Sequence, residues 1–338
     1  MKKTIYDIAK ELDLAPSTIS KVLNNTGSVS QKTRARVQSH VKRVGYVATS
    51  NARILKSKKS WTIGIVFSDE SEIGLEHPFF SSVLQSFKVY VEKKGYEIVF
   101  IVSYIGENKM SYLQWCRNKK VDGVLIVIGD INDKNIIELV NSEIPCVSTD
   151  ISMNQLHSVY SDNESGMVQA FDYAEQLGFD KIAVIPGPLS AKAYLERFEA
   201  YEKLMAERNL SIRPGYIALA RSYGFTSGFE AVTEMLEQVE ELPEIILAGS
   251  DDIALGVIRG IEAKGYHVPN DISVIGFDDI HFAKHYTPAL TTIRQDKTEI
   301  GVRSAQVLLD LIEQKDEIHP VITKIPVSLI VRDSTKQL

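Results

Sequence analysis

The chain has 338 residues, of which 44% are hydrophobic and 24% are charged, and its formal net charge is −6 at pH 7. This balance is typical of a globular protein with two or three domains and a sizeable core. No apolar run approaches the ~18 residues of a membrane-spanning helix, and the start of the chain turns acidic at Asp7 before an apolar run develops. We therefore expect neither a membrane protein nor a secreted one.

The two cysteines, Cys116 and Cys146, are far apart in the sequence and do not form a CxxC pair. Their number excludes a disulfide scaffold and a thiolate metal site, and it fits a reducing cytoplasm. The sequence thus predicts a cytoplasmic protein without a cysteine-bound metal.

The charge is divided unevenly along the chain. Residues 1–60 contain 13 lysine and arginine residues and 3 acidic ones, whereas residues 61–338 contain 25 basic and 41 acidic residues. This division favours a polyanion-binding segment joined to a body that polyanions repel. A solvated, lysine-rich tail would have the same composition, so composition alone leaves both interpretations open.

Apolar side chains recur at helical spacing in three stretches of the basic segment. We predict a helix over residues 4–12, a turn at 13–15, a second helix over 16–24, and a third helix that Ser30 caps and Gly45 ends. Three helices with a tight turn between the first two form a helix-turn-helix unit, whose second helix can enter the major groove of DNA.

The predicted second helix carries small hydrogen-bonding side chains and one basic side chain at Ser17, Thr18, Ser20 and Lys21. These residue types suit contacts with base edges. A plain three-helix bundle with a solvated polar face would show the same pattern, but the excess of positive charge argues against it.

Four segments of this basic region, residues 4–9, 17–24, 29–34 and 45–47, resemble the N-terminus of the lactose-repressor/galactose-repressor family of transcriptional regulators. The resemblance continues along the whole chain to residues 331–334. It implies that the following residues contact DNA: Thr4, Tyr6, Pro16, Ser17, Thr18, Ser20, Lys21, Asn24, Ser30 and Thr33.

The basic region departs from the family pattern at two positions. Asp13 stands where the family usually has a glycine in the turn, and Ala15 stands where it usually has a serine before the second helix. We expect these departures to cost turn strain and helix capping without breaking the unit.

Residues 48–60 are small, polar and basic, and taken alone they predict a flexible tether. In the family this segment is a hinge helix that folds on the operator, where a leucine wedges into the minor groove. The resemblance therefore implies DNA contacts from Asn51, Ala52 and Leu55. The family's usual proline and asparagine before this helix are Ala48 and Thr49, which predicts looser docking of the hinge.

From residue 61 onward, short apolar runs alternate with helical patterns, which indicates an α/β architecture with parallel sheets. We predict strands over 62–67, 98–102, 121–128, 181–185, 245–248 and 273–277, and helices that include 78–94 and 108–119. The resemblance implies two flavodoxin-like lobes, as in periplasmic sugar-binding proteins, with crossovers near 161, 290 and 325. It thus implies a first lobe of about 61–160 and 291–324 and a second of about 161–290 and 325–338.

Ligands of such sheets bind at the carboxyl ends of the strands. Polar residues that follow predicted strands are Asp150, Ser250, Asp251 and Asp278, and Arg197 lies in a predicted helix. Carboxylates and a guanidinium group suit the hydroxyl groups of a sugar, and Phe79, Phe80 and Tyr223 offer aromatic faces. The resemblance marks Arg197 and Asp278 as the strongest effector contacts. It adds Ser250, Asp150 and Tyr223, and Gln295 on the third crossover as a sensor of closure.

Each of these candidates also has a purely structural interpretation. Asp251 and Asp278 would serve equally as helix N-caps, Arg197 would form a surface salt bridge, and Phe79 or Phe80 would belong to the core. The seven histidines form no HExxH motif or other tight ligand pair, and we expect them to be surface residues.

The sequence contains neither a phosphate-binding GK[ST] loop nor a Gly-x-Ser-x-Gly nucleophile motif. We therefore expect no enzyme, no cofactor and no metal, and we expect a repressor whose operator affinity depends on a small-molecule effector, a sugar or sugar derivative. A purine-type corepressor remains the alternative. A solute-binding protein of transport type would lack the basic segment.

The family resemblance implies a homodimer, and a dimer predicts a palindromic DNA operator. The leucine heptads that form tetramers in the family do not occur before Leu338. We therefore expect a dimer and not a tetramer.

Overall fold

A computed structural model describes residues 3–23, 27–46, 59–67, 74–313 and 319–337. The chain divides into two compact units, Met1–Trp61 and Thr62–Leu338. Four predicted DNA contacts, Asn24, Asn51, Ala52 and Leu55, lie outside the described residues, as does most of the predicted hinge segment. Within the described residues, no helix is both long enough and apolar enough to cross a membrane.

The N-terminal unit contains the three predicted helices: α1 (Ile5–Leu12), α2 (Pro16–Leu23) and α3 (Gln31–Arg43). One small core joins them, since Ile8, Ile19 and Val37, one from each helix, are fully buried. Burial of these side chains is what orients α2 against the other two helices.

Side chains that the sequence provides fix the ends of these helices. Thr4 accepts a hydrogen bond from the amide of Asp7, and the Asp7 carboxylate accepts one in return from the amide of Thr4. Ser30 caps α3 by accepting from the amide of Thr33. Asp13 ends α1 in the left-handed conformation with a φ of 50°, which explains why a glycine suits this turn.

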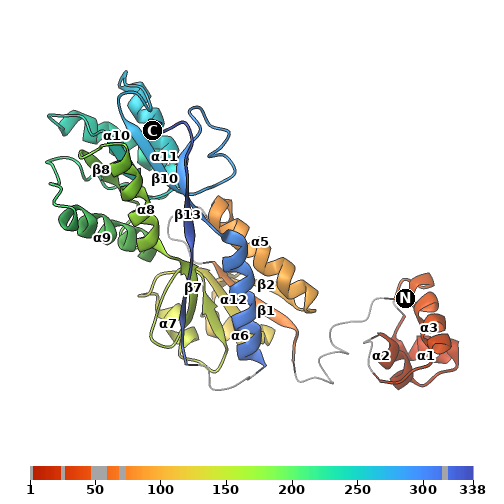
Figure 1. The fold of residues 1–338 in the computed structure, drawn as a ribbon. Coiled ribbons are helices and arrows are strands. Elements are labelled where there is room, and N and C mark those ends of the chain that lie inside the picture. Colours follow the sequence, from red (N-terminus) through yellow and green to blue (C-terminus); the bar gives the residue numbers. More distant parts are fainter. Residues whose placement is uncertain (1–2, 24–26, 47–58, 68–73, 314–318, 338) are drawn as a thin grey trace. The chain divides into compact units, whose positions relative to one another are not determined.

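The second unit consists of two lobes, each a sheet between two pairs of helices (Figure 1). The first lobe has strands β1 (Thr62–Phe67), β2 (Glu97–Ile101), β5 (Gly123–Ile128), β6 (Cys146–Ser148), β7 (His157–Ser161) and β12 (Ile322–Ile325). Its helices are α5 (Pro78–Lys93), α6 (Tyr112–Lys119), α7 (Lys134–Val140) and α12 (Lys297–Ile312), with the 3-10 turn η1 (Gly74–Glu76) before α5.

The second lobe has strands β8 (Ile182–Ile185), β9 (Ile245–Ala248), β10 (Ser273–Asp278), β11 (Thr291–Gln295) and β13 (Val327–Ile330). Its helices are α8 (Asn163–Gln176), α9 (Lys192–Glu207), α10 (Phe225–Gln238) and α11 (Asp251–Ala263).

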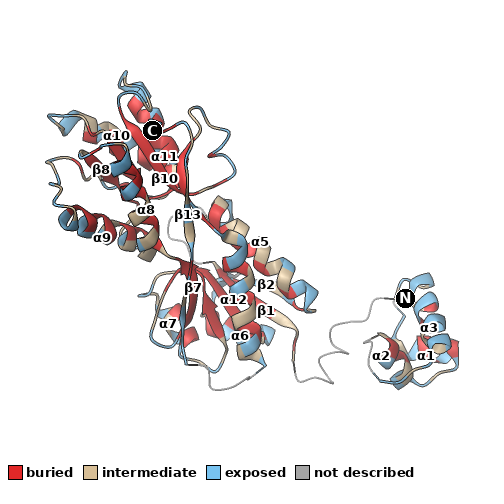
Figure 2. Cartoon of the chain, in the orientation of Figure 1, coloured by how far each residue is buried: buried red, intermediate tan, exposed pale blue. Residues whose placement is uncertain are grey.

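Both sheets have the strand order of flavodoxin-like folds. The order in the first lobe is β2-β1-β5-β6-β7-β12, and all its neighbours run parallel. The order in the second lobe is β8-β9-β10-β11-β13, with an isolated bridge from Val184 to Ile217 beyond β8 and with β13 antiparallel to β11. Figure 2 shows the buried strands at the centre of each lobe. The predicted parallel α/β architecture is confirmed.

The chain crosses between the lobes at three single residues, Asp162, Asp296 and Pro326, each of which separates an element of one lobe from an element of the other. Two predicted crossovers, near 161 and 325, agree with this. The crossover predicted near 290 is wrong, because β11 pairs with β10 in the second lobe along Thr291–Arg294. The first lobe therefore resumes only after Asp296.

The predicted helix over 108–119 is also too long. Residues 104–109 form a small hairpin of β3 (Tyr104–Ile105) and β4 (Asn108–Lys109), and α6 begins only after Ser111. Ser111 caps the helix by accepting from the amide of Gln114 at 3.3 Å. This capping box is the local signal that marks the true start.

Helices α5 and α12 of the first lobe pack side by side (Figure 1). They approach so closely at Gly301 that a Cβ atom there would overlap the carbonyl oxygen of Val83. The glycine thus permits backbone contact between the two helices.

Candidate functional site

The N-terminal unit presents the predicted DNA-contacting side chains of α2. Pro16, Ser17 and Lys21 are exposed, and Thr18 and Ser20 are half-buried, whereas Ile19 and Val22 face the core. The aliphatic part of Lys21 packs against Gly27. Helix α2 therefore offers one polar face, as a groove-binding helix requires.

Further predicted contacts lie at the starts of α1 and α3. Tyr6 is 70% exposed, an unusual state for a large aromatic side chain. Thr4 and Ser30 are exposed residues whose side chains cap α1 and α3, and Ser30 also shares a hydrogen bond with the hydroxyl of Thr33 at 2.9 Å. Thr4 and Ser30 thus each stand at the N-terminus of a helix, and helix N-termini attract phosphate groups.

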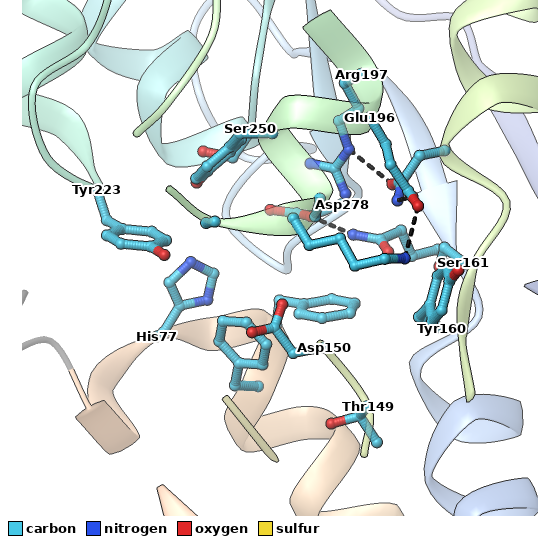
Figure 3. Close-up of a pocket in the computed structure, with 18 residues that line it drawn as sticks. His77, Thr149, Asp150, Tyr160, Ser161, Glu196, Arg197, Tyr223, Ser250 and Asp278 are labelled. Atoms are coloured by element: carbon cyan, nitrogen blue, oxygen red, sulfur yellow. Dashed lines mark hydrogen bonds and ion pairs between the residues drawn. The ribbon is translucent and has the colours of Figure 1, made fainter. Parts of the chain in front are cut away.

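A pocket lies between the two lobes of the second unit, at the carboxyl ends of their strands (Figure 3). We refer to it as the interlobe pocket. Eight of the nine predicted effector contacts line it: Phe79, Phe80, Asp150, Arg197, Tyr223, Ser250, Asp278 and Gln295. The pocket at the carboxyl ends of the strands thus brings together residues that are up to 216 positions apart in the sequence.

Arg197, on α9, is the buried cation of the pocket. Its Nε donates to Asn163 Oδ1 at 2.9 Å and its Nη1 donates to the carbonyl oxygen of Gly249 at 2.6 Å. Its guanidinium group lies 3.5 Å from the ring centroid of Phe277. Burial lowers the pKa of Arg197, and the nearby charge of Asp278 offsets part of that shift. Arg197 is therefore not the surface salt-bridge residue of the alternative interpretation.

Asp278 ends β10 with its carboxylate directed into the pocket (Figure 3). Its Oδ1 accepts a hydrogen bond from the side-chain amide of Gln295. Burial raises the pKa of Asp278 to about 6, although the charges of Arg197 and Lys297 oppose the rise. Asp278 and Asp279 have φ values of 134° and 51°, so two successive residues other than glycine have positive φ. No helix follows Asp278 directly, and it is not an N-cap.

Asp251 is the one predicted contact that does not line the pocket. It is the first residue of α11, which Ser250 caps, and its side chain turns inward to hold the loop after β10. Its Oδ2 accepts from the amide of Ile280 at 2.8 Å, and its Oδ1 accepts from the hydroxyl of Thr292. Burial and the charge of Asp278 raise the pKa of Asp251 to about 8. Asp251 thus supports the site from behind.

Gln295 lies at the end of β11, beside the second crossover and not on the third. It joins the pocket to the connection between the lobes, because its amide binds Asp278 one residue before the chain enters the first lobe.

The first lobe contributes an aromatic wall. The His77 ring lies 4.8 Å from the ring of Phe80 and 6.2 Å from the ring of Tyr223 in the opposite lobe. Tyr223 in turn lies 5.4 Å from Tyr194, and Phe79 lies 5.1 Å from Phe80. Phe79 and Phe80 are buried, as core residues are, and they also line the pocket. Both interpretations that the sequence allowed for them therefore hold.

A polar group forms another side of the pocket. Lys192 Nζ binds Glu196 Oε1 at 2.6 Å, and Glu196 Oε2 accepts from Asn163 Nδ2 at 2.7 Å. Lys192 also lies 3.5 Å from the ring centroid of Tyr160, which belongs to the first lobe. The Lys192–Tyr160 contact therefore joins the two lobes.

Several lining residues were missed by the sequence analysis: His77, Thr149, Tyr160, Ser161, Asn163, Ala191, Lys192, Ala193, Tyr194 and Glu196. A sequence signal exists for four of them. Tyr160, Ser161 and Asn163 surround the end of β7, and Tyr194 lies three residues before Arg197 on α9, hence on the same helix face.

The expectation that all histidines lie on the surface is wrong for three of them. His40, His77 and His157 are buried. His40 bridges α3 to α1 through Glu11 at 2.7 Å, and the Nδ1 of His157 accepts from the amide of Val321 at 3.3 Å. Among the described residues, no group of three acidic, histidine or cysteine side chains is arranged to hold a metal ion.

Comparison with known proteins matches the two units to two families. Residues 4–48 match the bacterial regulatory proteins of the lacI family, and residues 171–335 match the periplasmic binding protein-like domain. The chain is 31% identical over 340 residues to catabolite control protein A of Priestia megaterium, covering 99% of this chain and all of the relative. It is 32% identical to the HTH-type transcriptional repressor PurR of Haemophilus influenzae, covering 99% of each.

Solved structures show the same fold over the full length. The Lac repressor dimer bound to operator and the anti-inducer ONPF has a TM-score of 0.82 and 26% identity, covering 99% of each chain. The complex of the transcriptional regulator CelR with cellobiose has a TM-score of 0.73 and 25% identity, covering 98% of this chain and 99% of that one.

These relatives are transcriptional regulators and not enzymes. Together with the helix-turn-helix unit and the two-lobed body, they establish that the chain belongs to the lacI family of bacterial regulatory proteins.

Proposed function

We propose that this protein is a transcriptional repressor whose affinity for a DNA operator is set by a small molecule, a sugar or sugar derivative, bound in the interlobe pocket. The observation that carries the proposal is the pairing of Arg197 and Asp278 on one wall with the rings of Phe79 and Phe80 on the other. A guanidinium group and carboxylates suit paired hydroxyl groups, and aromatic rings suit the CH face of a sugar ring.

Contacts from both lobes supply the mechanism of regulation. A ligand that touches Asp150 and Phe80 of the first lobe and Arg197 of the second binds more tightly when the lobes close on it. A ligand shifts a conformational equilibrium by as much as its affinities for the two states differ. Closure would then change the affinity of the protein for its operator.

We propose further that the protein acts as a homodimer on a palindromic site. One similar structure supports this, because it is that of the Lac repressor dimer bound to operator. Two recognition helices related by a two-fold axis read half-sites about one helical turn apart.

Selection of binding sites from a random pool of duplex DNA tests the DNA-binding part. We expect enrichment of a palindrome, with affinity that falls steeply with salt. Lys21→Ala on α2 should weaken binding to the selected DNA. The matched variant Lys10→Ala on α1 should have an affinity much closer to that of the wild type. A pool that yields no preferred sequence would contradict the proposal.

Fluorescence anisotropy of the protein–operator complex, titrated with cellobiose, ribose, hypoxanthine and guanine, tests the effector. We expect a sugar to change operator affinity by about 5- to 150-fold, the usual range of allosteric coupling. Asp150→Asn in the pocket should abolish the response. Asp130→Asn, a carboxylate in the first lobe that does not line the pocket, should retain it.

A purine corepressor is the second candidate, because the repressors named PurR are 32% identical over nearly the whole chain. The planar faces of Phe79, Phe80 and Tyr223 are equally suited to stacking on a purine. The same titration distinguishes the two, since a corepressor would tighten operator binding with hypoxanthine or guanine and leave it unchanged with either sugar.

A further inference from the structure

Lys297 is a half-buried residue that lies outside the interlobe pocket, at the first position of α12. Its Nζ donates to the carbonyl oxygen of Asp278 at 2.5 Å and to that of Asp279 at 3.0 Å. A single ammonium group thus binds two successive backbone carbonyls of the turn after β10.

The turn that Lys297 binds has an unusual backbone. Asp278 and Asp279 both have positive φ, a region in which side chains other than glycine are strained. Such a conformation persists only when the surroundings determine it. The Asp279 carboxylate contributes by binding Arg294 at 2.6 Å and Arg332 at 2.5 Å, but all three of these groups belong to the second lobe.

Lys297 differs from these arginines because it approaches from the first lobe. It precedes the contact of α12 with α5, where Gly301 allows the two backbones to meet. Helix α5 begins with the residues of the aromatic wall, His77 just before it and Phe79 and Phe80 in its first turn. Lys297 therefore connects the turn that bears Asp278 to the helix pair that carries the opposite wall of the pocket.

We propose that Lys297 is a positioning residue, which holds the Asp278–Asp279 turn in its strained conformation and thereby directs the Asp278 carboxylate into the pocket. This role rests on the proposed function of the pocket as the effector site. It assigns to Lys297 no contact with the effector itself. Lys297, which belongs to the first lobe, would thus fix the position of a carboxylate of the second lobe.

Hydrogen–deuterium exchange of the full-length protein without effector tests the proposal, with the amides of residues 279–283 as reporters. The amide of Ile280 binds Asp251 at 2.8 Å, so it is protected only while the turn keeps its shape. In Lys297→Met we expect exchange of these amides to rise about tenfold or more, while strand β1 (Thr62–Phe67) keeps its protection.

Two further variants sharpen the test. Lys297→Arg retains a cation with several donors and should restore protection to within about threefold of the wild type. Arg303→Met removes an exposed charge from the same helix and should leave the turn unchanged. A turn that exchanges equally in Lys297→Met and wild type would overturn the proposal, as would a rise spread evenly over the second unit or a failure of arginine to restore protection.

This experiment uses no effector, so its outcome is separate from that of the titration described above. A protein that responds to no sugar or purine would contradict the proposed function while the exchange result still reported on Lys297. Unchanged exchange with a clear effector response would instead overturn only the positioning role.

Discussion

The two walls of the interlobe pocket use different physical means to shape it. The wall from the second lobe consists of buried charges held by hydrogen bonds, with Arg197 and Asp278 at its centre and Asp251 behind them. The wall from the first lobe consists chiefly of rings, in which Phe80 contacts both His77 and Phe79.

The difference teaches which side of the pocket tolerates change. A buried charge that loses its partner retains its full desolvation cost, so removing one member of such a set strongly lowers the free energy of unfolding. Packed rings lose contacts gradually, and a neighbouring side chain of similar volume replaces much of the loss. We therefore expect the second-lobe wall to be far more sensitive to substitution than the first-lobe wall.

The largest effect should come from Arg197→Met. This change deprives the buried Asp278 of the stronger of its two nearby positive charges, and it leaves Asn163 and the Gly249 carbonyl without their donor. We expect the free energy of unfolding to fall by about 3–5 kcal/mol, the range for a broken buried charge pair. Urea unfolding followed by circular dichroism measures it.

The control for this variant is Arg221→Met, which removes an 80% exposed arginine from the same lobe. A surface pair of this kind contributes about 0–1 kcal/mol. If Arg197→Met cost no more than its control, the second-lobe wall would not depend on its buried charge.

The next largest effect concerns pH and Asp251. Burial raises the pKa of Asp251 to about 8 and that of Asp278 to about 6, above their values in an unfolded chain. Between pH 4 and pH 8 the folded protein therefore holds protons that the unfolded chain has released. The stability conferred by these protonated carboxyls is fully present only below about pH 4 and is lost as pH rises toward 8.

We expect the free energy of unfolding to fall between pH 6 and pH 8 with a slope of up to about 1.4 kcal/mol per pH unit for each proton. Asp251→Asn should remove most of this slope, since the amide cannot ionise. Asp333→Asn, at an exposed carboxylate, should leave it as in the wild type. Identical slopes in wild type and Asp251→Asn would show that Asp251 is ionised at neutral pH.

A smaller effect is expected from the aromatic wall. Phe80→Leu keeps an apolar side chain against His77 and Phe67 and should cost about 1 kcal/mol in unfolding free energy. Leu308→Met, a comparable exchange in the core of the same lobe, provides the reference. A cost for Phe80→Leu above that of Arg197→Met would reverse the comparison between the two walls.

The smallest effect should follow from Lys192→Gln, at the contact between the lobes. The change removes a cation from the face of the buried Tyr160 ring and from Glu196, and the side chains of Lys192 and Glu196 are both partly exposed to water. We expect a loss of about 0.5–1 kcal/mol. The double variant Lys192→Gln with Tyr160→Leu measures the coupling, which should vanish if the ring and the ammonium group do not interact.

Much of this fold could be predicted from the sequence because its strongest signals are local. The apolar runs of 62–67 and 245–248 have the same bounds as β1 and β9. The position of residues after predicted strands, together with the family resemblance, pointed to Arg197, Asp278 and Asp150, and all three line the interlobe pocket, since parallel strands gather their carboxyl ends at one edge.

The rest depended on pairings between distant segments. Nothing in the run Thr291–Gln295 tells which lobe it joins, because a buried strand has the same composition in either sheet. The inward turn of Asp251 depends on Thr292, which lies 41 residues away. Periodicity and capping rules do not reach such distances, so both predictions failed there.

The threefold crossing of the chain between the lobes has a consequence for synthesis on the ribosome. Strands β8 to β11 emerge as one continuous stretch, so the second lobe can form most of its sheet early. The first lobe begins earlier yet must wait for α12 and β12, which arrive only after β11 and complete its cover over α5 and its edge beside β7. The nascent first lobe thus exposes apolar surface while residues 162–296 are translated. We expect the chain to be most prone to aggregation, and most in need of chaperones, during this interval.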